Sequence, residues 1–156
     1  MYRFRQIDDY QFSPSSKLIL PHTVLAQQFV RSGQYGEYLA RVRGALLTLF
    51  GDPLDNASDA AYCYRLEATD ELGKSWTLTA YEGASGAAIG GNPHDQSVYP
   101  VAQALQQLID TITPRDFEVT RYNDEYDATI TYGCKDGIPY YYETRGSASR
   151  ASGRLD

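Results

Sequence analysis

The sequence predicts an α+β fold in which a mainly antiparallel sheet packs against two or three amphipathic helices. Two observations carry this prediction. Hydrophobic residues recur every three or four positions in some segments, as on one face of a helix, and alternate with polar residues in others, as in half-buried strands. The strand-like segments form hairpins and a final meander without a β-α-β-α alternation, which favours antiparallel pairing.

The first 33 residues predict a strand followed by a short helix. Residues 2–7 alternate as a strand does, and Ser13-Pro14-Ser15-Ser16 breaks the pattern. Residues 17–20 fit a short strand or the lead-in to a helix. Pro21 suits a first helical turn, where its missing N–H costs nothing, and the apolar spacing that follows is helical until Gly33.

Two longer segments predict amphipathic helices, at residues 36–50 and 98–112. Gly51 and Pro53 end the first, and Pro100 is tolerated in the second because it lies in the first turn. The first apolar stripe is Tyr35, Tyr38, Leu39, Val42, Ala45, Leu46, Leu49 and Phe50. The second is Val98, Val101, Ala102, Leu105, Leu108, Ile109 and Ile112.

The remaining segments predict strands. Residues 62–68 and 76–81 alternate about a turn that contains Gly73, which indicates a hairpin. A glycine-rich loop is expected over Gly83–Gly91. Three further arms are rich in strand formers, and the last two are joined by Lys135-Asp136-Gly137: residues 117–122, 128–132 and 138–144.

Length and composition indicate a single globular domain. The 156 residues are 42% hydrophobic, and a chain of this size can fold without disulfides or metal. We expect one domain over residues 1–145 and a disordered tail over residues 146–156, which lack apolar bulk. Cys63 and Cys134 are expected to be buried small hydrophobic residues.

Charge and motif content exclude several classes of partner. The formal net charge is −6, whereas binding to nucleic acid needs a cationic face. No apolar run approaches the roughly 18–20 residues that cross a bilayer, and the N-terminus does not resemble a signal peptide, so we expect a cytoplasmic protein that does not contact a membrane. We expect no cofactor and no metal site, because CxxC is absent and His22 and His94 are remote in sequence.

The segment Gly83–Asp95 is where catalytic chemistry would first be sought. It lacks the Lys-Ser/Thr pair of a phosphate loop and the GxGxxG spacing, and its Ser85 stands in an incomplete GxSxG. His94 and Asp95 are adjacent, and neighbours in sequence rarely converge on one target. The sequence therefore predicts no catalytic residues.

Tyrosines and acidic residues together predict a protein-binding surface. The chain has fourteen tyrosines, a residue that gives large, stiff contact area at interfaces. In Tyr140-Tyr141-Tyr142, strand alternation turns Tyr141 one way and its neighbours the other. The predicted partner-binding residues are Tyr122, Asp124, Glu125, Tyr126 and Asp127, with Asp52, Asp55 and Asp59 as a second group.

A longer sequence pattern also indicates a protein-binding function. It consists of Leu49-Phe50-Gly51-Asp52-Pro53-Leu54, Tyr62-x-Tyr64, Ala68-Thr69-Asp70 and Gly73-Lys74-x-Trp76-x-Leu78-Thr79-x-Tyr81-x-Gly83-x-Ser85-Gly86-x-Ala88-Ile89-Gly90-Gly91. Over residues 37–112 the chain resembles the small immunity proteins of bacterial polymorphic toxin systems. The resemblance implies a protein that binds a cognate toxin domain and blocks its active site or its access to substrate, with no catalytic residue and no cofactor.

The resulting expectation is an immunity protein that occludes a basic toxin domain. Two alternatives stay open. One is a structural or adaptor module that forms a homodimer or larger assembly through an exposed strand edge. The other is a small enzyme that uses the Gly83–Asp95 segment with His94.

Overall fold

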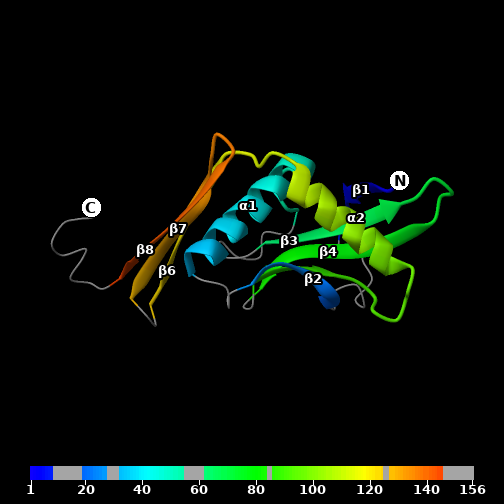
Figure 1. The fold of residues 1–156 in the computed structure, drawn as a ribbon, viewed down its shortest axis with the longest axis horizontal. Coiled ribbons are helices and arrows are strands. Elements are labelled where there is room, and N and C mark those ends of the chain that lie inside the picture. Colours follow the sequence, from blue (N-terminus) through cyan, green and yellow to red (C-terminus); the bar gives the residue numbers. More distant parts are fainter. Residues whose placement is uncertain (9–18, 28–31, 55–61, 84–85, 125–126, 146–156) are drawn as a thin grey trace.

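The computed structural model describes residues 1–8, 19–27, 32–54, 62–83, 86–124 and 127–145. Within these ranges the chain forms two helices and eight strands (Figure 1). The helices are α1 (Ser32–Phe50) and α2 (Val98–Thr111). The strands are β1 (Arg3–Gln6), β2 (Ile19–Gln27), β3 (Cys63–Thr69), β4 (Ser75–Gly83), β5 (Gly86–Gly90), β6 (Phe117–Asn123), β7 (Ala128–Lys135) and β8 (Ile138–Arg145).

The strands form two separate antiparallel sheets. The five-stranded sheet has the order β1-β3-β4-β5-β2, and the three-stranded sheet has the order β6-β7-β8. Figure 1 shows α2 lying along the five-stranded sheet and α1 between that sheet and the three-stranded one. The predicted α+β class is confirmed, while the single expected sheet is divided in two.

The core lies between the five-stranded sheet and the helices. Strand β3 buries every second residue, as its alternating pattern predicts, and Tyr64, Leu66 and Ala68 face inward. Helix α2 buries the predicted stripe around Leu105 and Ile109. The described helices do not have the combination of length and apolar character that crossing a bilayer requires.

Helix α1 approaches the three-stranded sheet through small residues. A Cβ at Gly36 would lie 2.1 Å from Tyr141 Cγ, and one at Gly44 would lie 2.7 Å from Pro114 Cβ. Between them, the Cys134 thiol donates to the Ala40 carbonyl at 3.4 Å. These short side chains bring the helix backbone close to the sheet, so that α1 is shared by the two sheets.

Two predictions about local structure are wrong. The helix expected from Pro21 to Gly33 is replaced over Ile19–Gln27 by strand β2, which pairs antiparallel with β5. The glycine-rich loop expected over Gly83–Gly91 contains strand β5, which lies between β4 and β2. The small residues of β5 are buried in the sheet: Ala87, Ala88 and Gly90.

The tight turns follow the sequence closely. Gly73, in the β3–β4 turn, has φ +87°. In the β7–β8 turn, Asp136 and Gly137 have φ values of 54° and 80°, as the two central residues of a hairpin turn require. The predicted hairpin and meander are therefore confirmed. The tail expected to be disordered, residues 146–156, lies outside the described residues.

Candidate functional site

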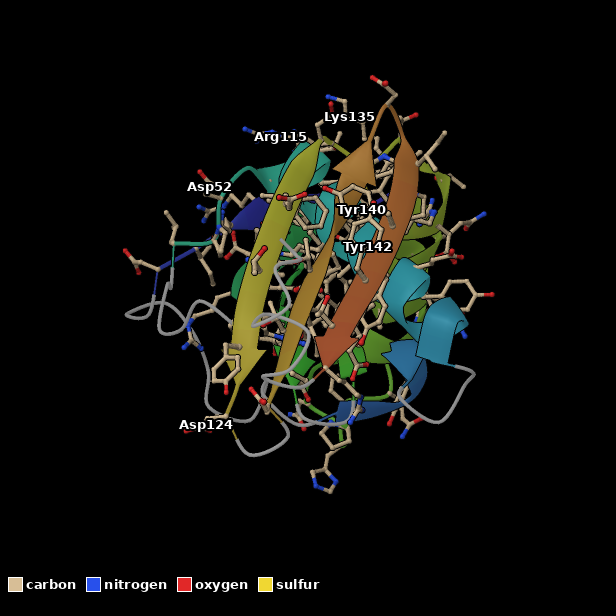
Figure 2. The ribbon with its side chains drawn as sticks, turned by 90° about the vertical axis from the view of Figure 1, so that its left-hand side faces the viewer. Asp52, Arg115, Asp124, Lys135, Tyr140 and Tyr142 are labelled. Carbon is tan, nitrogen blue, oxygen red and sulfur yellow. The ribbon has the colours of Figure 1, made fainter. Side chains whose placement is uncertain are left out.

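The three-stranded sheet has one face against α1 and one outer face. Tyr132, Cys134 and Tyr141 are on the inner face, where they pack against the core and α1. Because side chains alternate along a strand, their neighbours point away from the helix. Figure 2 looks onto this outer face. Its residues are Glu118, Thr120, Tyr122, Thr129, Thr131, Gly133, Lys135, Ile138, Tyr140, Tyr142 and Thr144.

Three tyrosines stand on this outer face. Tyr122 is 54% exposed and Tyr142 is 60% exposed, and Tyr140 is half-buried. The prediction that Tyr141 points opposite to its two neighbours is confirmed, since Tyr141 meets Gly36 of α1. Strands hold these rings at fixed spacing, so the face offers aromatic contact area that needs little ordering on binding.

The structure brings part of the predicted tyrosine-acid group together. The Tyr122 hydroxyl donates to Asp127 Oδ1 at 2.8 Å across the β6–β7 connection. Asp124 is exposed in the same connection. Tyr122 thus belongs to the outer face, and the two aspartates lie at its end. Glu125 and Tyr126 lie outside the described residues.

The second predicted group is not part of this patch. Asp52 is exposed after the end of α1, and Figure 2 places it far from Asp124 along the β6 side of the molecule. Asp55 and Asp59 lie outside the described residues. The two groups of acidic residues therefore do not form one continuous surface through the residues that the structure describes.

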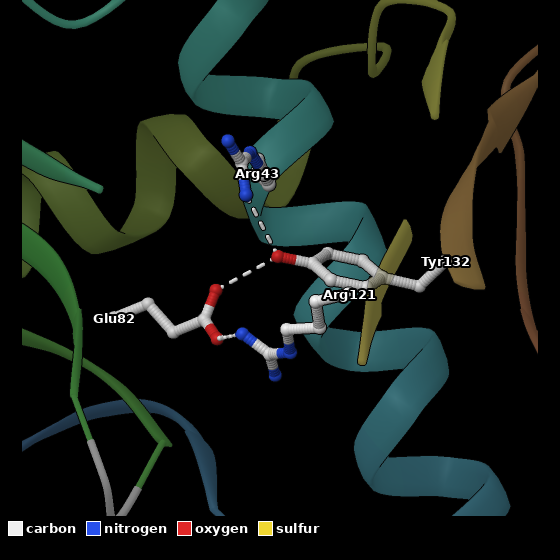
Figure 3. A network of polar contacts seen from close by, with 4 residues as sticks. All are labelled: Arg43, Glu82, Arg121 and Tyr132. Carbon is white, nitrogen blue, oxygen red and sulfur yellow. Dashed lines mark hydrogen bonds and ion pairs between the residues drawn. The ribbon is translucent and has the colours of Figure 1, made fainter. Parts of the chain in front are cut away.

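A buried polar network joins the two sheets (Figure 3). Glu82 of β4 is only 6% exposed, and both of its oxygens accept hydrogen bonds from the three-stranded sheet. The Tyr132 hydroxyl donates to Oε1 at 2.9 Å, and Arg121 Nη1 donates to Oε2 at 2.8 Å. Arg43 of α1 donates in turn to the Tyr132 hydroxyl at 2.8 Å. The network links α1 to both sheets.

Aromatic rings and burial shape the electrostatics of this network. The Arg43 guanidinium lies 5.1 Å from the centre of the Tyr62 ring and 5.9 Å from that of Phe117. Burial, followed by the charge of Glu82, raises the pKa of Tyr132 to about 12. The same two causes raise the pKa of Tyr62 well above its usual value. Both tyrosine hydroxyls therefore stay protonated. The carboxylate of Glu82 points at Tyr132 and Arg121 and not into an open cleft.

Asp95, at the end of the Gly83–Asp95 segment, helps to position the start of helix α2. Asp95 Oδ1 accepts hydrogen bonds from the Ser97 N–H at 3.0 Å and from its hydroxyl at 2.6 Å. These bonds, the hydroxyl first, lower the pKa of Asp95. Trp76 Nε1 donates to the Ser97 hydroxyl at 2.8 Å, which ties β4 to the start of α2. His94 is exposed beside them, and Ser85 lies outside the described residues.

Two further features of the described chain are its cysteines and a surface groove. Cys63 and Cys134 lie on different sheets and are not joined by a disulfide, and burial raises the pKa of Cys134 to about 11. In the described part of the chain, no three histidine, cysteine or acidic side chains gather as metal ligands would. A groove of about 430 Å³ lies between the β1 end of the chain and α2, lined by Met1, Tyr2, Phe4, Ala104, Gln107, Leu108 and Thr111.

Sequence reasoning missed two carboxylates that the fold makes important. Glu82 occupies an alternating strand position like any exposed residue, and its partners are 39 and 50 residues away. Glu118 belongs to neither group of predicted partner-binding residues. The signal that singles it out is Gly133, a glycine inside a strand, which indicates that another group lies close over the backbone.

Comparisons of this chain with models of protein families, with curated protein sequences and with solved structures find no match.

Proposed function

We propose that this protein is an immunity protein that binds a basic toxin domain and neutralises it by covering its active site or its access to substrate. The observation that carries the proposal is the outer face of the three-stranded sheet. It presents tyrosines on rigid strands, and Tyr122 and Tyr142 keep more than half of their surface exposed. Large exposed rings on a preorganised surface are typical of protein interfaces.

Charge supports a basic partner. The segment that contains this sheet, residues 115–145, has seven acidic and four basic residues, and the whole chain has net charge −6. Opposite charge on a partner would steer the encounter and raise the association rate, while the tyrosines would slow dissociation. Occlusion of this kind needs no reacting group on the immunity protein, in keeping with the resemblance of residues 37–112.

Co-expression tests the proposal directly. Each reading frame adjacent to the gene is expressed in bacteria, alone and together with this protein. We expect one product to be toxic alone, harmless in the presence of this protein, and bound to it after purification. If no neighbouring product is toxic, or if toxicity is unchanged by co-expression, the immunity function is wrong.

The predicted patch is tested in the same complex. Tyr122→Ala combined with Asp124→Ala should weaken toxin binding at least tenfold, or about 1.4 kcal/mol. Tyr38→Ala is the matched control, because Tyr38 is 50% exposed on α1 and away from the outer face. Equal affinity of the double variant and the control would remove this patch. Light scattering of the protein alone tests the adaptor alternative, which requires an oligomer without toxin.

A further inference from the structure

Tyr140 lies flat on the outer face because the residue beside it is glycine. In the register of the sheet, Gly133 stands between Tyr140 of β8 and Glu118 of β6. A Cβ at Gly133 would lie 2.1 Å from the Phe117 carbonyl oxygen and 2.7 Å from the Tyr140 hydroxyl oxygen, so a side chain there would displace the β6 backbone and the ring. The ring therefore crosses β7, and its hydroxyl donates to Glu118 Oε2 at 2.7 Å.

Tyr142 lies beside the Tyr140 ring on the same face. The ring centres of Tyr140 and Tyr142 are 5.4 Å apart and the ring planes differ by 35°. Both rings project from β8 on the side shown in Figure 2. Together with Glu118 they form a pair of adjacent, mutually tilted rings with a carboxylate at the edge, which we call the Tyr140 platform.

Glu118 gives the edge of the Tyr140 platform a negative charge, and Lys135 stands on the same face two residues beyond Gly133. Glu118 is exposed, and none of the lysines and arginines that the structure describes forms an ion pair with it. The faces of aromatic rings are themselves negative. The hydrogen bond to Glu118 raises the pKa of Tyr140 to about 12, so the hydroxyl keeps its proton and the ring keeps its position.

We infer that the Tyr140 platform binds an arginine side chain of the partner. The guanidinium would stack on a ring face of this pair while its N–H groups donate to the carboxylate of Glu118. Arginine fits better than lysine because its planar head can stack and hydrogen-bond at once. This inference rests on the proposed function for the basic character of the partner, and it adds a site and a chemical group that the predicted Tyr122 patch does not include.

The site is tested without a toxin. The full chain is titrated with a blocked pentapeptide, Gly-Arg-Gly-Arg-Gly, and with its lysine counterpart, and the tyrosine ring signals are followed by NMR. We expect the arginine peptide to shift the signals of Tyr140 and Tyr142 and to bind at least threefold more tightly than the lysine peptide. Glu118→Gln and Tyr142→Ala should each weaken the arginine peptide at least fivefold.

Two matched controls separate this site from general charge attraction. Glu71→Gln removes one exposed carboxylate from the β3–β4 turn, and Tyr38→Ala removes one exposed ring from α1. Both should bind the arginine peptide within twofold of wild type. Equal losses in Glu118→Gln and Glu71→Gln would overturn the inference, as would ring shifts caused by a neutral oligosaccharide such as maltotetraose with none caused by the peptide.

The outcome is independent of the toxin experiment. Specific binding of the arginine peptide together with no neutralised neighbour would refute the immunity function and leave the site standing. Toxin neutralisation that is unchanged by Glu118→Gln and Tyr142→Ala, with no peptide binding, would refute the site and leave the function standing.

Discussion

At the scale of single residues, Glu82 is a carboxylate taken out of water and held by side chains from the other sheet. Its two oxygens accept hydrogen bonds from Tyr132 and Arg121, and Arg43 donates a hydrogen bond to the Tyr132 hydroxyl. A buried ion pair of this kind is weak support for stability as a whole, because both charges lose water. Removing one partner is different, since the other charge then remains buried and unpaired.

Glu82→Ala should therefore destabilise the protein strongly. We expect a loss of about 2–4 kcal/mol in the free energy of unfolding, below the upper values for such pairs because Arg121 keeps some access to water. Urea denaturation measures it. Glu67→Ala is the control, since Glu67 pairs with the largely exposed Arg5 at 2.7 Å and should cost less than about 1 kcal/mol. Similar losses in the two variants would show that the network does not hold the sheets together.

The role of Glu82 could not be predicted from the sequence. The alternation of β4 places it on a face, but the identity of what covers that face depends on residues 39 and 50 positions later. The alternation within Tyr140-Tyr141-Tyr142 is different, because it depends only on the geometry of one strand. That prediction is confirmed by the contact between Tyr141 and Gly36.

At the scale of elements, helix α1 has glycines where a helix would ordinarily prefer alanine. Gly36 and Gly44 lie on the side that meets the three-stranded sheet. Replacing a glycine by alanine inside a helix usually stabilises it by about 0.5–1 kcal/mol. Here the added methyl group would enter space already filled by Tyr141 or by Pro114.

Gly36→Ala and Gly44→Ala should each destabilise the protein by about 1–3 kcal/mol, because the crowding exceeds the gain in helix propensity. Thermal unfolding measures the effect, with the exposed Glu37→Ala as the control on the same helix. In a Tyr141→Ala background, Gly36→Ala should cost clearly less, since the ring that it displaces is gone. An additive double variant would contradict the proposed close approach.

The elements that the sequence predicts well are those with strong local signals. Helix α2 begins at the predicted Val98, and the turn at Asp136-Gly137 has the required backbone angles. The sequence predicts a helix where β2 forms, because the spacing of Val24 and Leu25 satisfies either pattern over so short a run. Its strand conformation comes from pairing with β5, whose partner residues are 59 to 71 positions away.

At the scale of the whole molecule, two sheets share one helix and one buried network. The sequence predicts antiparallel strands, but it does not predict that they form two sheets. Local alternation does not determine whether β6 pairs with β1 in one sheet or belongs to a second sheet. The same limit applies to the predicted partner-binding surface. Tyr122 and Asp127 meet because they flank one hairpin, whereas Asp52 lies elsewhere on the molecule.

This sharing predicts that the two sheets unfold together. Trp76 is the single tryptophan and reports on the five-stranded sheet, while Cys134 is buried in the three-stranded sheet under α1. In a Cys63→Ser variant, urea should change Trp76 fluorescence and expose the Cys134 thiol to labelling at the same midpoint, as in a two-state transition. Labelling of Cys134 well below the fluorescence midpoint would show that the three-stranded sheet separates first.

The shared helix also has a consequence for synthesis of the chain. Gly36 is made early, whereas Tyr141, the ring that covers it, is made about a hundred residues later. At the usual translation rate of about 5–20 residues per second, this side of α1 waits roughly 5–20 s for its cover. During that interval the uncovered side of the nascent helix contains glycine and alanine, so it exposes little apolar surface on which other chains could aggregate.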